Sequence, residues 1–184
     1  MLHTTKTRDL VLTALFAALT AVGAFIRIPF AFSAITLQVF FTDMAGILLG
    51  RKWGALSQLV YVLLGLLGLP IFTAGGGFGY FLYPTCGFLL GLIPSAWVIG
   101  RLTEKKADFA HITVACLAGL GVLYLIGIPY MALILNGYMG KGMSLWGILM
   151  AGMIPFLPGD AVKILAAAVL CPQLTKRLRQ VHFD

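Results

Sequence analysis

Long apolar runs, separated by short polar or glycine-rich stretches, dominate the pattern along this chain. A membrane-spanning helix needs about 20 predominantly apolar residues, and six runs come close to or reach that length. The pattern predicts spans at residues 9–26, 35–50, 54–70, 83–100, 111–133 and 155–173. We therefore expect an all-α integral membrane protein with six transmembrane helices in one bundle, forming a single domain over residues 1–184.

Two stretches interrupt the helical pattern. Residues 70–84 contain four glycines within five positions, at 75, 76, 77 and 79. Such backbone can approach a ligand closely, and at membrane depth it is tolerated only inside protein or along a cavity. In the second stretch, residues 136–159, the apolar run 143–154 is too short to cross and predicts a short interfacial helix.

Composition supports the membrane assignment. The chain has 184 residues, of which 60% are hydrophobic and 10% charged, whereas soluble domains are about 45–50% apolar. A net charge of +7 would suggest nucleic acid as the partner of a soluble protein. Here the positions of the charges indicate topology instead, and we expect a lipid bilayer and no nucleic acid as the surroundings.

Basic residues gather in alternate connections between the predicted spans. Ten of the thirteen lie on one side, at positions 6, 8, 51, 52, 101, 105, 106, 176, 177 and 179. Only Arg27 and Lys141 lie on the other side, and Lys163 falls inside the sixth span. By the positive-inside rule both termini are expected to be cytoplasmic. The two interruptions then share the outer side, where they predict one pocket that opens outward.

Asp160 and Lys163 place a carboxylate and an ammonium inside the sixth predicted span. Ionisable side chains at that depth are costly, so they indicate a functional site. On a helix, residues three apart share a face, and Pro158-Gly159 predicts a break just before the helix begins. Asp160 would then lie at the helix N-terminus, where the helix dipole favours negative charge. The alternative is structural, with Asp160 as a cap neutralised by Lys163.

Polar residues in the second span and small residues in the first leave two interpretations each. Gln38 and Thr42 lie one turn apart, and either substrate contact or hydrogen bonding between helices explains them. Asp43 has no obvious partner. The stripe Ala14-x-x-x-Ala18 permits close helix approach, either within the bundle or against another protein.

Signals for enzyme chemistry are scarce. G-x-x-x-x-G-K-[ST] and H-E-x-x-H are absent, and the glycine run fails G-x-G-x-x-G because Tyr80 stands in the last position. The three cysteines, at 86, 116 and 171, show no metal-ligand spacing and are interpreted as packing residues. We expect neither an enzyme nor a metal or prosthetic group, and transport against a gradient would need a partner to supply energy.

The chain resembles the BioY family, the substrate-binding (S) component of biotin energy-coupling-factor (ECF) transporters, over essentially its whole length. The motifs that carry the resemblance are Ile35-Thr36-Leu37-Gln38, residues 48–57 (LLGRKWGALS), residues 65–72 (GLLGLPIF), Gly79-Tyr80, Pro84-Thr85, Gly87 and residues 156–163 (FLPGDAVK). It departs from the family pattern at Cys86 and Phe88, which puts pocket contacts from that segment in question, and at Arg51.

The resemblance implies a multi-pass protein of a prokaryotic cell membrane that binds biotin near the outer face. It also implies partners: a transmembrane coupling subunit and two ATPase subunits. Asp160 and Lys163 match residues that hold the ureido ring, Ala14 and Ala18 match the face that docks on the coupling subunit, and the loop expected to close over the ligand comprises Gly75, Gly76, Gly77, Gly79 and Tyr80.

The chemistry agrees with this assignment, because a cyclic urea offers two N–H donors and one acceptor to a carboxylate beside an ammonium. For the carboxylate of biotin, the glycine-loop N–H groups, Arg27 and water all stay open. Gln38 is a further candidate contact with the substrate. The alternative function is an autonomous proton-coupled secondary transporter of a small vitamin-like solute, with Asp160 or Asp43 as the proton relay.

Overall fold

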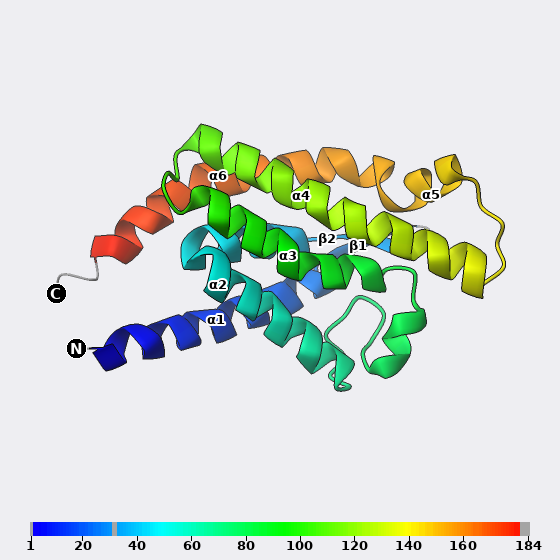
Figure 1. The fold of residues 1–184 in the computed structure, drawn as a ribbon, viewed down its shortest axis with the longest axis horizontal. Helices are drawn as coiled ribbons and strands as arrows, with labels where there is room; N and C mark the ends of the chain where they lie inside the picture. The colour runs from blue at the N-terminus through cyan, green and yellow to red at the C-terminus, as the bar shows by residue number, and fades with distance from the viewer. Residues whose placement is uncertain (1, 31–32, 181–184) are drawn as a thin grey trace.

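The computed structural model describes residues 2–30 and 33–180, which are mostly helical. Figure 1 shows the longer helices running along one axis of the molecule. In chain order the elements are α1 (Leu2–Phe25), β1 (Arg27–Phe30), β2 (Ser33–Thr36), α2 (Gln38–Leu66), the 3₁₀ turn η1 (Phe78–Leu82), α3 (Cys86–Thr103), α4 (Phe109–Ala132), the π-helical turn η2 (Leu133–Tyr138), α5 (Leu145–Gly152), the 3₁₀ turn η3 (Ile154–Phe156) and α6 (Leu157–Gln180).

Five helical stretches are long and apolar enough to cross a membrane. They are Thr7–Phe25, Gln38–Leu66, Cys86–Thr103, Phe109–Tyr138 and Leu145–Thr175. The prediction of a mostly helical membrane protein with several spans is confirmed. The predicted count of six is not established, because the second and third predicted spans both lie in α2.

Helix α2 reverses direction at Gly50. This residue has φ 76° and ψ 178°, a conformation that favours glycine. A Cβ at Gly54 would lie 2.8 Å from the carbonyl oxygen of Ala45, so the arms 38–49 and 51–66 pack closely and antiparallel. The sequence predicted separate spans with a connecting loop, whereas one glycine makes the turn.

A short antiparallel hairpin joins α1 to α2 and was not predicted. Strand β1 pairs with β2 in a register that sets Arg27 opposite Thr36 and Ile28 opposite Ile35. Thr36, assigned from sequence to the second span, is instead the last residue of β2, next to the start of α2. Neither strand alternates apolar and polar residues, as RIPF and SAIT show, so the period-2 pattern that would predict a strand is absent.

Helix α6 begins earlier than predicted. Its helical residues start at Leu157. The backbone departs from helical geometry before that, at Met153, which has φ −136° and ψ −65°. Pro158 and Gly159 therefore lie in the first turn and do not form a break before it. Proline is tolerated there because its missing N–H would have no partner inside the helix. Asp160 still lies in the first turn, as predicted.

The interior of the bundle combines large apolar side chains with small and polar residues, and many further large apolar side chains lie exposed on its outside. A Cβ at Gly46 in α2 would lie 2.8 Å from the carbonyl oxygen of Ala96, so α2 and α3 are in close contact. Between α1 and α2, the side-chain amide of Gln58 donates to Thr20 over 3.2 Å. Leu125 in α4 is 75% exposed, as expected for a side chain that faces lipid.

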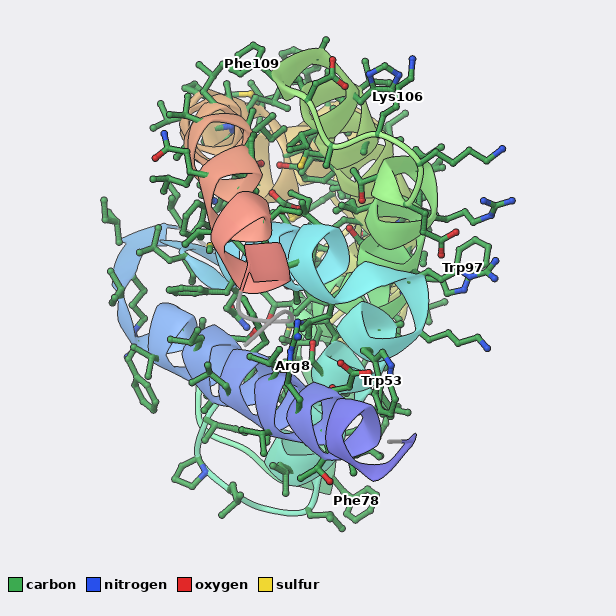
Figure 2. All side chains as sticks on the ribbon, turned by 90° about the vertical axis from the view of Figure 1, so that its left-hand side faces the viewer. Arg8, Trp53, Phe78, Trp97, Lys106 and Phe109 are labelled. Carbon is green, nitrogen blue, oxygen red and sulfur yellow. The ribbon has the colours of Figure 1, made fainter. Side chains whose placement is uncertain are left out.

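The two ends of the molecule differ in charge. The described ends of α1 and α6, the Gly50 reversal and the connection from α3 to α4 lie together on the left in Figure 1. There Glu104 pairs with Arg51 over 3.0 Å and Arg101 over 3.4 Å, and Figure 2 looks onto this end, with Arg8 and Lys106 labelled. The glycine loop and the connection from η2 to α5 lie at the opposite end, on the right in Figure 1.

Candidate binding pocket

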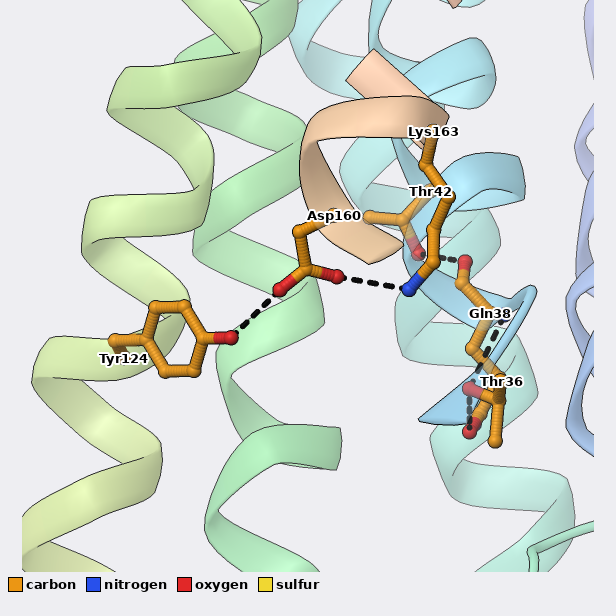
Figure 3. Close-up of polar contacts among 6 residues, drawn as sticks. All are labelled: Thr36, Gln38, Thr42, Tyr124, Asp160 and Lys163. Atoms are coloured by element: carbon orange, nitrogen blue, oxygen red, sulfur yellow. Dashed lines mark hydrogen bonds and ion pairs between the residues drawn. The ribbon is translucent and has the colours of Figure 1, made fainter. Parts of the chain in front are cut away.

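The first two turns of α6 carry a buried ion pair. The ammonium of Lys163 donates to Asp160 Oδ1 over 2.8 Å, and the two side chains are 9% and 4% exposed. The hydroxyl of Tyr124 in α4 donates to Asp160 Oδ2 over 2.6 Å. Figure 3 shows both contacts. Each carboxylate oxygen of Asp160 is thus engaged, and α4 is tied to α6 at this point.

The buried pair keeps hydrogen-bonding capacity. An ammonium has three donors and a carboxylate about four lone-pair sites. Among the described residues, Asp160 is the one recorded partner of Lys163, and Asp160 accepts two bonds. A ligand that brings both donors and acceptors can therefore bind without breaking the pair. Removing one ion would leave the other buried without a partner, which is the costly outcome.

Gln38, at the start of α2, forms the wall that faces this pair (Figure 3). Its side-chain oxygen accepts from the Thr36 hydroxyl over 3.1 Å, and its nitrogen donates to the Tyr61 hydroxyl over 2.7 Å. Tyr61 in turn donates to the carbonyl oxygen of Ile71, which precedes the glycine loop, over 3.1 Å. Gln38 is thus held between the hairpin, the second arm of α2 and the loop.

Three hydroxyl groups come to the pocket from the segment around the glycine loop. The Tyr80 hydroxyl lies 3.0 Å from that of Thr73 and 3.2 Å from that of Thr85, and all three residues line the cavity. Tyr80 is 2% exposed, and its ring stacks on that of Tyr83 with the centroids 5.0 Å apart. The loop is therefore packed onto the bundle by its aromatic residues.

The loop glycines support this packing, and none of them is a lining residue of the cavity. Gly75 and Gly77 have φ of 113° and 93°, and the Gly77 N–H donates to the carbonyl oxygen of Gly65 in α2 over 2.7 Å. A Cβ at Gly76 would overlap the Leu69 carbonyl oxygen, whereas Gly79 has open space around it. That these four glycines close over a ligand stays a prediction.

Apolar side chains complete the cavity, which extends over about 80 Å³ of space open to the centre of a water molecule. One water needs only about 10–15 Å³ on this measure, so the site has room for a larger guest. Phe88 lines the wall and Cys86 does not, so of the two departures from the family pattern in this segment only Phe88 reaches the cavity. The other apolar lining residues are Val39, Leu89, Leu92, Leu123 and Phe156.

The structure thus brings Asp160, Lys163, Gln38 and Tyr80 to one cavity, as the sequence suggested for a single pocket. Sequence reasoning missed Tyr124, whose partner lies 36 residues away. The available signal was a tyrosine in the middle of an otherwise apolar span, where its hydroxyl requires a polar partner.

The docking candidates lie elsewhere. Ala14 and Ala18 are exposed on α1, whereas Ala17, at the side of this stripe, is buried in the core. Because α1 packs mainly against α2, the face with Ala14 and Ala18 is open. Its role in binding a coupling subunit stays a prediction.

Comparisons with known proteins agree with the family resemblance of the sequence. A model of the BioY family matches residues 1–180. A probable biotin transporter BioY from Lysinibacillus sphaericus is 41% identical over 99% of this chain and 94% of the relative. The biotin transporter BioY of Thermotoga maritima is 39% identical over 92% of this chain and 96% of the relative.

A solved structure shares the fold. The crystal structure of the S-component for biotin from an ECF-type ABC transporter superposes with a TM-score of 0.82 at 26% identity. The match covers 96% of this chain and 95% of that chain.

Proposed function

The chain belongs to the BioY family, and from this premise we propose that it is a high-affinity biotin-binding membrane subunit that mediates biotin uptake. Membership in a transporter family agrees with the expectation that the chain is not an enzyme. In the proposed system biotin is the transported ligand, and separate ECF coupling and ATPase subunits supply the energy. The names of the relatives and of the solved S-component support the substrate and the class of transporter.

The observation that carries this proposal is the buried Asp160–Lys163 pair at the cavity wall. A ureido ring offers two N–H groups to the carboxylate of Asp160 and a carbonyl oxygen to the ammonium of Lys163. The apolar bicyclic body and side chain of biotin suit the aliphatic and aromatic lining around Phe88 and Phe156. The hydroxyl of Tyr124 holds the carboxylate in place for this contact.

We further propose that each arm of α2 crosses the membrane, which gives six transmembrane segments with both termini cytoplasmic. The antiparallel arms and the basic residues at the Gly50 end support this topology. The pocket would then lie toward the outer face, beneath the glycine loop. The open face of α1 with Ala14 and Ala18 would contact the coupling subunit.

The glycine loop gives a test of the proposed gate. Gly76→Ala is expected to weaken biotin binding by about 5- to 160-fold, equivalent to the roughly 1–3 kcal/mol of an overpacked site. The new Cβ overlaps the Leu69 carbonyl oxygen, so the loop that carries Thr73 and Tyr80 must move. Biotin titration of the purified variant measures the effect.

Gly121→Ala is the matched control for this substitution, because a Cβ there has no neighbour within 4 Å. Its biotin affinity should equal that of the wild type. Wild-type affinity in Gly76→Ala would contradict a role for the loop in binding.

The proposed function is tested by uptake of labelled biotin into proteoliposomes. The purified chain should bind biotin alone, and uptake should require the coupling subunit, the two ATPase subunits and ATP. Uptake by the chain without partners or ATP, abolished by a protonophore, would instead support the proton-coupled alternative. Absence of biotin binding by the folded protein would refute the substrate.

A further inference from the structure

Asp43, in the first arm of α2, is the buried carboxyl group among the described residues that the proposed binding site does not use. Its side chain is 1% exposed, and neither carboxylate oxygen has a hydrogen-bond partner among the described residues. By contrast, Asp160 accepts two hydrogen bonds. A carboxylate without a partner in the protein interior is so unfavourable that the group takes up a proton instead.

The pocket ions are the charged neighbours of Asp43. Asp160 and Lys163 of α6 both influence it electrostatically, and Lys163 forms its ion pair with Asp160 and not with Asp43. Among the described residues, the thiols of Cys116 in α4 and Cys171 in α6 also interact electrostatically with it. The neighbouring helices α1 and α3 contact this arm through small or apolar residues. Gly23 of α1 lies against Phe41, and Ala96 and Ile99 of α3 lie against Gly46.

Two carboxyl groups therefore act electrostatically on one ammonium, and among the described residues Asp160 alone forms an ion pair with it. Lys163 has a flexible four-carbon side chain, and its ammonium can reorient toward a second carboxylate near the first. In the structure the ammonium is paired with Asp160 over 2.8 Å and forms no ion pair with Asp43. Once Asp43 is ionised, it competes for the same charge.

We infer that Asp43 is a proton-binding site that competes with the ligand pocket for Lys163. The protonated form leaves the ammonium to Asp160 and to the ligand, and the ionised form draws it away. On ionisation, the O–H bond of the carboxylic acid breaks, its electron pair stays on the oxygen, and the proton passes to water. Loss of this proton weakens ligand binding, so protonation of Asp43 is linked to capture and deprotonation to release.

The sign of the linkage follows from this competition. By this inference the ligand-bound protein holds the proton of Asp43 more tightly than the free protein does. At a pH where Asp43 of the free protein is ionised, ligand binding therefore takes up a proton. Affinity then falls as the pH rises through that range, by up to about tenfold per pH unit for one proton. This inference rests on the proposed function, because biotin is the ligand used to test it.

The experiment measures biotin affinity against pH for the wild type, Asp43→Asn and Asp108→Asn, with proton uptake obtained calorimetrically in two buffers of different ionisation enthalpy. The wild type should lose affinity at alkaline pH and take up a proton there. Asp43→Asn, which is permanently neutral, should bind at neutral pH with a flat profile and no proton uptake. Asp108 is exposed near the connection from α3 to α4, so its variant should follow the wild type.

A flat wild-type profile, or the same slope in Asp43→Asn, overturns the inference while biotin binding itself stands. If the folded wild type does not bind biotin, the proposed function fails, and infrared difference spectra without ligand decide the inference. A deuterium-sensitive C=O stretch of a protonated carboxyl group should then appear in the wild type and be absent from Asp43→Asn. If that variant does not fold, Asp43→Ser replaces it, and a spectrum without this band in the wild type overturns the inference.

Discussion

Replacing Lys163 by alanine is expected to weaken biotin binding by about 30-fold to several-thousand-fold. This range corresponds to the roughly 2–5 kcal/mol lost when one partner of a buried charge pair is truncated. The variant removes the donor proposed for the ureido oxygen and leaves the carboxylate of Asp160, which is 3% exposed as a residue, without its counter-charge. Equilibrium binding of biotin to the purified protein measures the loss.

Lys105→Ala is the matched control, because it removes a lysine from the connection between α3 and α4, far from the pocket in sequence and at the basic end of the molecule. It should bind like the wild type. Monodisperse elution and unchanged helical content would establish that Lys163→Ala is folded. Undiminished tight binding by that folded variant would refute the assignment of Lys163.

Asp160→Asn is expected to weaken biotin binding to a similar degree, by at least about 30-fold, which corresponds to about 2 kcal/mol. Asparagine keeps the size of the side chain but replaces one acceptor oxygen with an amide that donates. That amide would face either the Tyr124 hydroxyl or the Lys163 ammonium, which both donate to Asp160. The substitution also leaves the two N–H groups of the ureido ring with one acceptor oxygen fewer.

Asp108→Asn controls for the general loss of a carboxylate, since Asp108 pairs with His111 on the surface, with a side chain 60% exposed. Titration with biotin, and with an analogue that lacks the ureido N–H groups, separates the two effects. Asp160→Asn should reduce the preference for biotin over the analogue. An unchanged preference would mean that Asp160 maintains the structure of the pocket without forming hydrogen bonds to the ureido ring.

The features that the sequence alone predicts depend on residues that lie close together along the chain. Asp160 and Lys163 lie three residues apart, so helical geometry alone places them on one face, and the structure finds them in contact. Four glycines in five positions likewise indicate a non-helical loop without reference to any distant residue. The sequence also predicts the basic end of the bundle, because the basic residues lie in the short connections between the predicted spans.

The parts that escaped prediction depend on partners far along the chain. Tyr124 donates to a residue 36 positions away, and Gln38 to one 23 positions away. Such contacts depend on how the helices are rotated and offset against one another, which an apolar pattern with little amphipathic bias does not specify. For the same reason, the sequence indicated polar residues in the second span without deciding between substrate contact and helix packing.

The reversal at Gly50 shows the same division. The sequence by itself determined two apolar segments with basic residues between them, because hydropathy and charge depend on composition alone. Only the tertiary structure decided that one left-handed glycine joins the segments and that Gly54 packs against Ala45. Likewise, the sequence supplied two carboxyl groups and one lysine in the interior. Packing of α2, α4 and α6 pairs one carboxylate and leaves Asp43 without a partner among the described residues, since burial and distance are properties of the assembled bundle.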